Sequence, residues 1–159
     1  MSARSTRAPS RSPHSITCCI SVLPPLARGA SDRVIVTKLK VHSDLRGAVF
    51  EPLEAHRLGG WRNTHAVISE PGAVRGNHRH HRGTEVSSVS GASLVRYHEG
   101  KEIRDMQVPA GEVWRFEFPP GVAHAFKNTG ERPSLIVSFN TQLHDPAVPD
   151  AERVELIPG

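Results

Sequence analysis

The sequence predicts an all-β protein, an antiparallel β-sandwich or barrel for which the jelly roll is the leading candidate. After residue 34, short stretches rich in β-branched and aromatic residues recur about every eight to twelve residues, with turn-forming residues between them. No stretch in this part of the sequence combines a sustained helical period with helix-capping residues. Many short strands with few helices are typical of sandwiches and barrels.

The length of 159 residues suits one domain, which we place at residues 34–159 behind a disordered basic extension at residues 1–33. The extension holds five arginines and one aspartate, so it accounts for the whole formal charge of +4. The neutral remainder gives no reason to expect binding to nucleic acid or to a membrane. Cys18 and Cys19 both lie in the extension, which excludes a disulfide framework in the domain and fits a cytoplasmic location.

The first half of the domain is expected to contain two strands. Val34–Val41 alternates and is rich in β-branched residues, and Thr64–Ser69 has a similar texture. Asp44–Gly47 is expected to turn the chain, His56–Gly60 to form a loop, and Glu70–Gly72 to lead into a histidine-rich stretch.

The second half is expected to contain six strands, with Val154–Ile157 as a last edge strand. Glycine or proline occurs in each turn between them, which favours tight connections. The six strands are Thr84–Ser90, Leu94–Tyr97, Ile103–Val108, Val113–Phe118, Ala123–Lys127 and Ser134–Asn140.

Three histidines and a glutamate have the spacing of a metal-binding set. His78 and His80 are two residues apart, so on a β-strand their side chains lie on the same face. Glu85 follows on the next strand or turn, and His124, just after a Pro-x-Gly turn, can supply a fourth ligand. Imidazole and carboxylate together suit one divalent ion, with zinc in first place and iron, manganese or nickel as alternatives.

Two longer motifs around these residues resemble those of the cupin superfamily. The first covers residues 72–91 and the second residues 119–128, and together they contain the four candidate ligands. The resemblance implies a cupin-type antiparallel β-barrel. In some cupins the corresponding residues only link strands, so the metal role and the structural role both stay open.

Further residues resemble the C-terminal cupin domain of CapF-type capsular polysaccharide enzymes. They are an Asp-x-Arg-Gly element at 44–47, the stretch 75–85, the element 119–130 and an Asp-Pro-x-x-Pro-Asp element at 145–150. The Arg-Gly-x-His part of the second element also resembles dTDP-4-dehydrorhamnose 3,5-epimerases. Both resemblances imply a small-molecule substrate, a nucleotide-linked 4-keto sugar, that is epimerised in polysaccharide or glycoside biosynthesis.

Epimerisation next to a ketone needs a base and positive charge near the enolate oxygen. Arg46 and Arg75 have the planar fork that suits a diphosphate, and Arg75 or Lys127 could stabilise the enolate. The resemblance to the rhamnose epimerases makes His78 the base and brings Arg46 to the phosphates. A histidine that ligates a metal cannot also accept a proton, so we interpret His78 as a ligand. The base then stays open, with His81 or a metal-bound water as alternatives.

Two other functions use the same residues. A mononuclear iron dioxygenase would need the same three histidines and glutamate, and a non-catalytic cupin would bind a carbohydrate without converting it. CapF-type enzymes also carry a reductase domain, whereas this sequence shows no glycine-rich dinucleotide fingerprint and is not expected to transfer hydride. The exposed edge strands of a small barrel favour a homodimer.

Overall fold

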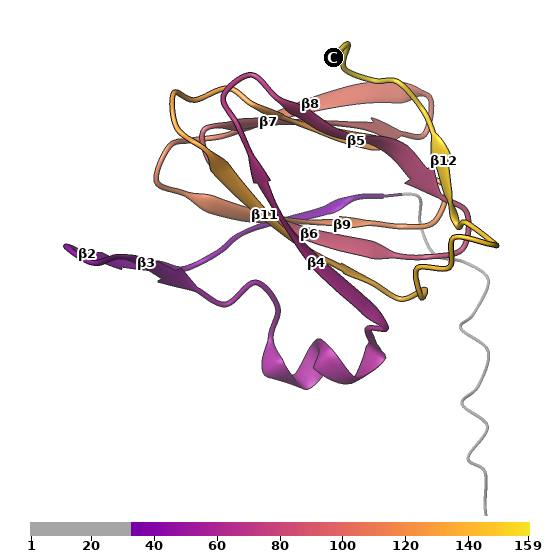
Figure 1. Ribbon diagram of the computed structural model, residues 1–159, viewed down its shortest axis with the longest axis horizontal. Coiled ribbons are helices and arrows are strands. Elements are labelled where there is room, and N and C mark those ends of the chain that lie inside the picture. The colour runs from indigo at the N-terminus through magenta and orange to yellow at the C-terminus, as the bar shows by residue number, and fades with distance from the viewer. Residues whose placement is uncertain (1–32) are drawn as a thin grey trace, which may run out of the picture.

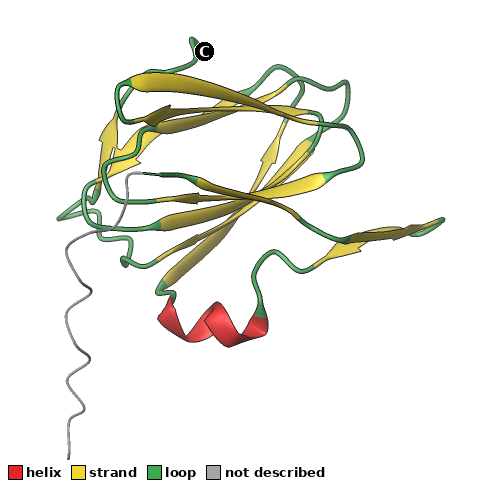
Figure 2. Cartoon of the chain, turned by 180° about the vertical axis from the view of Figure 1, so that it is seen from behind, coloured by secondary structure: helices red, strands yellow, loops and turns green. Residues whose placement is uncertain are grey.

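The all-β prediction is confirmed by a computed structural model, which describes residues 33–159 (Figures 1 and 2). Nearly all of the predicted basic extension, including both cysteines, lies outside the described residues. The strands are β1 (Ile35–Lys38), β2 (Val41–Asp44), β3 (Gly47–Phe50), β4 (Asn63–Ser69), β5 (Val74–His80), β6 (Glu85–Ser90), β7 (Ser93–Glu99), β8 (Glu102–Val108), β9 (Val113–Phe118), β10 (His124–Asn128), β11 (Ser134–Asn140) and β12 (Ala151–Arg153).

Two five-stranded antiparallel sheets face each other as the layers of a jelly roll (Figure 1). The first sheet has the strand order β1-β9-β6-β11-β4, and the second has the order β12-β5-β10-β7-β8. Strands β5 and β10 are therefore neighbours in the second sheet, while β6 lies in the facing first sheet. Side chains from these three strands can meet in the space between the layers.

The space between the sheets is filled by alternate residues of both sheets. On β9, Phe116 and Phe118 are buried in the core, whereas Arg115 and Glu117 lie on the opposite face. Burial of such side chains stabilises the fold by about 1.5–3 kcal/mol each. The buried core residues are Val34, Val89, Val95, Tyr97, Val108, Phe116, Phe118, Val122, Phe126 and Ile136.

Seven predicted strands are confirmed to within two residues at each end, but the prediction of one strand over Val34–Val41 is wrong. Strand β1 stops pairing with β9 at Lys38, and β2 then pairs with β3 in a separate two-stranded hairpin. The expected turn at Asp44–Gly47 joins these two strands. The hairpin projects away from both sheets (Figure 1). The alternating residues of Val34–Val41 therefore span the end of β1 and the start of β2, and they do not form one strand.

The prediction of an edge strand at Val154–Ile157 is also wrong, because the last edge strand is β12, which ends at Arg153. The N–H groups of Leu156 and Ile157 bond to the side-chain oxygen of Asn77 instead of a strand backbone. Both side chains pack in a second apolar cluster with Ala123 and Ala125. The tail is thus fixed by one amide side chain and by burial of apolar surface.

Residues 52–60 cover the outer face of the first sheet. The predicted loop at His56–Gly60 is instead part of a 3₁₀ helix, η1 (Ala55–Gly60), which lies beyond that sheet in Figure 2. Arg115, which is 5% exposed, pairs with Glu54 at 2.7 Å, and Arg57 bonds Glu117 through two nitrogens at 2.8 and 2.6 Å.

Within residues 33–159, no helix is long and apolar enough to cross a membrane.

A β-bulge in β5 decides which side chains enter the space between the sheets. The pairing of β5 with β10 shifts by one residue between His78 and Gly76. Gly76 and Asn77 have positive φ angles of 77° and 56°. Because of the additional residue, His78 faces inward and so does Arg75, which lies opposite the core residue Phe126.

The bulge predicts that Gly76→Ala lowers the free energy of unfolding by about 1–3 kcal/mol. A Cβ atom at position 76 would lie 2.9 Å from the carbonyl oxygen of His124 and 3.1 Å from the Cα of Ala125. Urea denaturation measures the difference. Gly59→Ala is the matched control, because a Cβ there meets no atom within 4 Å. Equal stability of G76A and the wild type would contradict the tight approach described.

Candidate metal centre

Three imidazoles converge on one carboxylate between the two sheets. His78 and His80 come from the end of β5, and His124 lies opposite His78 at the start of β10. Glu85 is the first residue of β6 in the facing sheet. The four residues that the sequence selected by spacing are therefore brought together by strand pairing and by the packing of one sheet on the other.

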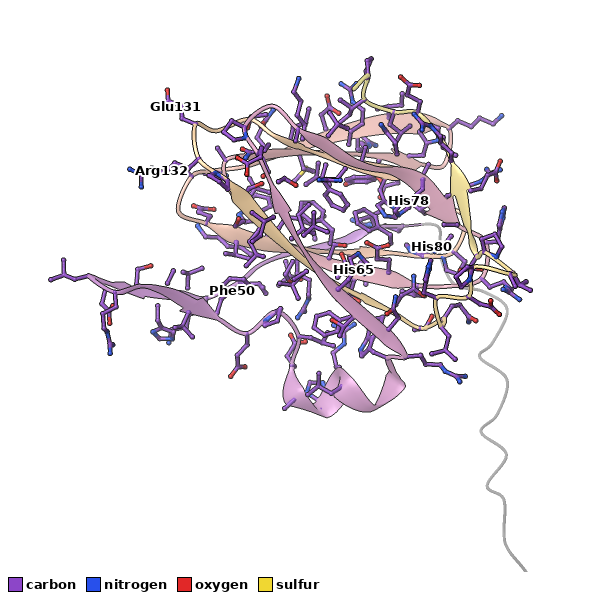
Figure 3. All side chains as sticks on the ribbon, in the orientation of Figure 1. Phe50, His65, His78, His80, Glu131 and Arg132 are labelled. Carbon is purple, nitrogen blue, oxygen red and sulfur yellow. The ribbon has the colours of Figure 1, made fainter. Side chains whose placement is uncertain are left out.

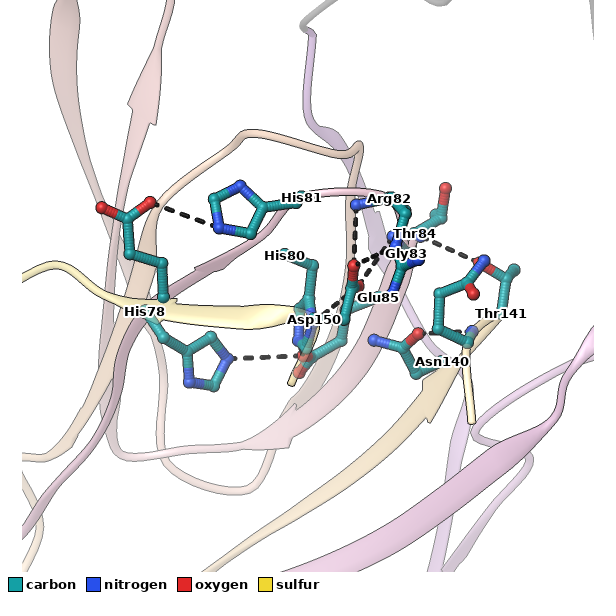
Figure 4. Close-up of polar contacts among 12 residues, drawn as sticks. His78, His80, His81, Arg82, Gly83, Thr84, Glu85, Asn140, Thr141 and Asp150 are labelled. Atoms are coloured by element: carbon teal, nitrogen blue, oxygen red, sulfur yellow. Dashed lines mark hydrogen bonds and ion pairs between the residues drawn. The ribbon is translucent and has the colours of Figure 1, made fainter. Parts of the chain in front are cut away.

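One oxygen of Glu85 is close to all three rings. Glu85 Oε2 lies 2.8 Å from Nε2 of His80 and 3.5 Å from Nε2 of both His78 and His124. The ligand atoms of His78, His80 and Glu85 all lie within 4.8 Å of one another. Figure 4 shows the rings of His78 and His80 directed at this carboxylate.

The donor atoms fit a divalent metal ion. The Nε2 atoms of His78 and His124 are buried and have no hydrogen-bond partner, which costs about 1–3 kcal/mol for each such atom. Nδ1 of His124 lies 3.1 Å from the carbonyl oxygen of Val122, so this contact assigns the proton to Nδ1. Nε2 is then the nitrogen that faces Glu85, and a cation held there in place of a proton would satisfy the carboxylate and the imidazoles together.

The carboxyl group of Glu85 is ionised although it is only 3% exposed. Burial alone would raise its pKa, but the charge of His124 and the polar contacts of all three imidazoles outweigh burial. They hold the pKa of Glu85 well below its usual range. Glu85 is thus in the form that can ligate a metal.

The surrounding packing fixes the ligand side chains. The ring of His124 stacks on Phe118 of the core, with centroids 4.0 Å apart and an interplanar angle of 5°. The second oxygen of Glu85 accepts a hydrogen bond of 2.7 Å from the hydroxyl of Ser87. The hydroxyl of Ser87 lies 2.7 Å from that of Ser138 on β11. These contacts restrict the rotation of groups that would otherwise have several orientations.

Polar residues continue from Glu85 across the inner face of the first sheet to the edge strand β4. Ser138 lies opposite both Ser87 and His65, so the three side chains share one face. In the same way, Asn140 lies opposite Glu85 and Asn63. We call this surface the polar wall, and it consists of Glu85, Ser87, Asn140, Ser138, Asn63 and His65.

The polar wall explains why β6 is more polar than a buried strand should be, and it adds a residue that the sequence did not single out. In the sequence, His65 has no histidine or carboxylate partner at a metal-ligand spacing. On β4, His65 lies two residues before Val67, which packs against the core, so both side chains point inward. Ile68, the next residue, points outward. The two-residue spacing from the apolar Val67 was the sequence signal that could have placed His65 on the inner face. His65 is solvent-exposed at the edge of the wall and faces the sheet that carries His78 (Figure 3).

The other four predicted site residues lie in four different places. Arg75 is exposed and faces inward on β5. Lys127 lies on the outer face of β10, opposite Val74. Arg46 is on the projecting hairpin, where its side chain is 90% exposed and pairs with Asp44 at 2.6 Å. His81 points away from the carboxylate of Glu85 in Figure 4; its side chain is 53% exposed, and Nε2 lies 3.5 Å from Glu152.

Asp150 is a further residue of this region that sequence reasoning did not assign individually. Its carboxylate accepts hydrogen bonds from the backbone N–H groups of Arg82 and Gly83, at 3.0 and 2.9 Å. Burial opposes its ionisation, but the hydrogen bonds from Arg82 and Gly83 and the charge of His80 lower its pKa. The sequence signal that could have singled out Asp150 was its position at the end of the Asp-Pro-x-x-Pro-Asp element.

Comparison with known proteins agrees with this fold. Residues 42–152 match the family model of the polysaccharide biosynthesis C-terminal domain. The probable low-salt glycan biosynthesis epimerase Agl13 of Haloferax volcanii is 29% identical over 140 residues, which cover 76% of this chain and 85% of that protein.

Two solved structures have similar folds. The capsular polysaccharide assembling protein CapF of Staphylococcus aureus aligns with a TM-score of 0.56 and 26% identity over 74% of this chain, which spans only 33% of CapF. The second structure is that of ChmJ, a 3'-monoepimerase from Streptomyces bikiniensis, in complex with dTDP-quinovose. It aligns with a TM-score of 0.62 over 77% of this chain and 70% of ChmJ. The sequence identity is 18%, so this likeness supports the fold alone. The resemblance to CapF-type cupin domains is confirmed, and the chain belongs to the family of polysaccharide biosynthesis C-terminal domains.

Proposed function

We propose that this protein is a carbohydrate epimerase or isomerase that acts on a nucleotide-linked 4-keto sugar by removing a proton next to the ketone. The observation that carries the proposal is the set of His78, His80, Glu85 and His124 at one end of the polar wall, with accessible groups beside it. The family match and the epimerase name of one relative support the reaction type. The substrate class that we propose follows the sugar nucleotide held by ChmJ, a protein of similar fold.

The reaction needs two kinds of group, and both are available on the inner faces. A zinc ion held by the three histidines and Glu85 would supply positive charge next to the carbonyl oxygen, which makes the neighbouring C–H more acidic. Arg75 is exposed at the same strand and can pair with a phosphate or with the developing enolate. The proposal does not use Lys127, because it lies on the opposite face of β10.

The base assigned by this proposal is His65. The proposal does not use His78 or His81 as the base, because the Nε2 atom of His78 is directed at the ligand set and the ring of His81 points out to Glu152. Strands β4 and β5 are joined by a short turn, and His65 and His78 each lie four residues from the strand end at that turn. Because strands advance about 3.3 Å per residue, the two histidines lie at a similar distance from that turn along their strands.

A hydrogen-exchange experiment tests the reaction. The zinc-loaded protein is incubated in D2O with a UDP- or dTDP-linked 4-keto hexose, and deuterium at the carbons next to the ketone is followed by NMR. We expect deuterium to enter at C3 or C5, because the proton that is removed exchanges with solvent. If a folded, zinc-loaded sample exchanges no proton in any such substrate, the proposed reaction is wrong.

The assignment of the base predicts that His65→Gln slows this exchange on the order of 10²–10⁴-fold while zinc binding is retained. His56→Gln is the matched control, because His56 lies on η1 at the outer face of the first sheet. Exchange by H56Q should equal that of the wild type. An unchanged rate in H65Q together with a large loss in His81→Gln would move the role of base to His81.

The metal set predicts that zinc stabilises the protein. A ligand at a hundredfold excess over its dissociation constant adds about 2.7 kcal/mol to the free energy of unfolding. Thermal melts with and without zinc should therefore differ in Tm for the wild type and for H56Q, but not for His124→Ala. Metal analysis of the purified protein completes the measurement. Iron together with oxygen consumption would point to a dioxygenase instead.

A further inference from the structure

The last described segment of the chain runs along the strand that carries two of the metal-ligand candidates. We call residues 150–157 the C-terminal strap. Its strand β12 pairs Ala151 with His80 and Arg153 with His78, at the edge of the second sheet (Figure 1). The backbone N–H of Val154 bonds to the carbonyl of Asn77 at 2.8 Å. The strap therefore lies directly against both histidines.

Asp150, at the start of the strap, reaches the side of His80 that is turned away from the ligand set. Nε2 of His80 faces Glu85 at 2.8 Å, and Nδ1 of the same ring lies 3.4 Å from Oδ2 of Asp150. Nδ1 is buried and has no hydrogen-bond partner, while the Asp150 side chain is only 7% exposed. The imidazole of His80 is thus held between two buried carboxylates, one on each nitrogen.

The carboxylate of Asp150 is itself held in place by the loop that precedes Glu85. Its Oδ1 accepts from the backbone N–H and Nε of Arg82, at 3.0 and 3.1 Å, and its Oδ2 accepts from the backbone N–H of Gly83 at 2.9 Å. A Cβ atom on Gly83 would lie 2.9 Å from Oδ2 of Asp150 and 2.5 Å from Oδ1 of Asn140. A glycine is needed for the carboxylate to approach this closely, and a rigid carboxylate can fix the ring beside it.

A histidine that ligates a metal through one nitrogen carries its proton on the other, and an acceptor for that proton fixes the tautomer and the ring orientation. We propose that Asp150 is the positioning residue for His80, so that the C-terminal strap and the metal ion bind the barrel cooperatively. This inference rests on the metal set proposed above. The Asp-Pro-x-x-Pro-Asp element would then serve to place the carboxylate of Asp150 beside Nδ1 of His80.

The test compares Asp150→Asn with the wild type and with Glu152→Gln. Glu152 is the matched control, since it belongs to the same strap and its carboxylate pairs with Arg79 and His81 on the outside, at 2.7 and 3.5 Å. Zinc affinity is measured by competition with a chromophoric chelator, and the visible absorption of the cobalt-substituted protein reports ligand geometry. Neither measurement depends on activity. The Tm of the metal-free proteins records purely structural effects.

We expect D150N to bind zinc on the order of 10–100-fold more weakly and to change the cobalt spectrum, while E152Q behaves as the wild type. Asp150→Glu, which keeps the charge, should recover part of the affinity if D150N folds poorly. Zinc affinity of D150N within about twofold of the wild type, or an equal loss in E152Q, would overturn the role of Asp150. Failure of the wild type to bind zinc or cobalt would instead disprove the metal set itself.

A second readout tests the coupling between the strap and the metal. If both bind cooperatively, zinc should slow proteolytic cleavage within residues 150–157 of the wild type and of E152Q. In D150N the protection by zinc should be lost even at zinc concentrations that saturate the site. Equal protection of D150N and the wild type at saturation would show that the strap and the metal bind independently.

Discussion

The structure depends on one carboxylate that is ionised in the space between two β-sheets. An unpaired buried charge is strongly unfavourable, so Glu85 is compatible with folding only because three imidazoles and the hydroxyl of Ser87 surround it. Those partners come from both sheets and from distant parts of the sequence. The electrostatic requirement of one side chain therefore specifies how the two layers pack at this end of the sandwich.

Two local features make this arrangement possible. The bulge at Gly76 and Asn77 lets Arg75 and His78 face inward together, although they are an odd number of residues apart. Asn77 also bonds the backbone of Leu156 and Ile157, so the residue that shapes the bulge fixes the C-terminal strap as well. Bulge, strap and ligand set thus form one connected unit, and a change in any of them reaches the others through direct contacts.

The division of the interior into a polar and an apolar part supports a catalytic use of the barrel. Phe116, Phe118 and Ile136 form a close-packed core, whereas the polar wall beginning at Glu85 extends to an accessible edge strand. Buried serines and asparagines stabilise a fold less well than aliphatic residues of similar size. Their concentration next to the histidines is what a site for a polar, carbohydrate-like ligand requires.

The sequence by itself determined the fold class and most strands, and it singled out the four residues that the structure brings together between the sheets. These signals are local: alternation and turn residues specify strands, and the spacing of His78 and His80 places them on one face. Only the tertiary structure decided the rest. Strand pairing placed His65 on the polar wall, and hydrogen bonds to Arg82 and Gly83 placed Asp150 beside His80. Contacts between residues far apart in the chain leave no periodic pattern in the sequence. The tertiary structure also turned both Arg75 and His78 inward through a bulge, which is backbone geometry that alternation does not encode.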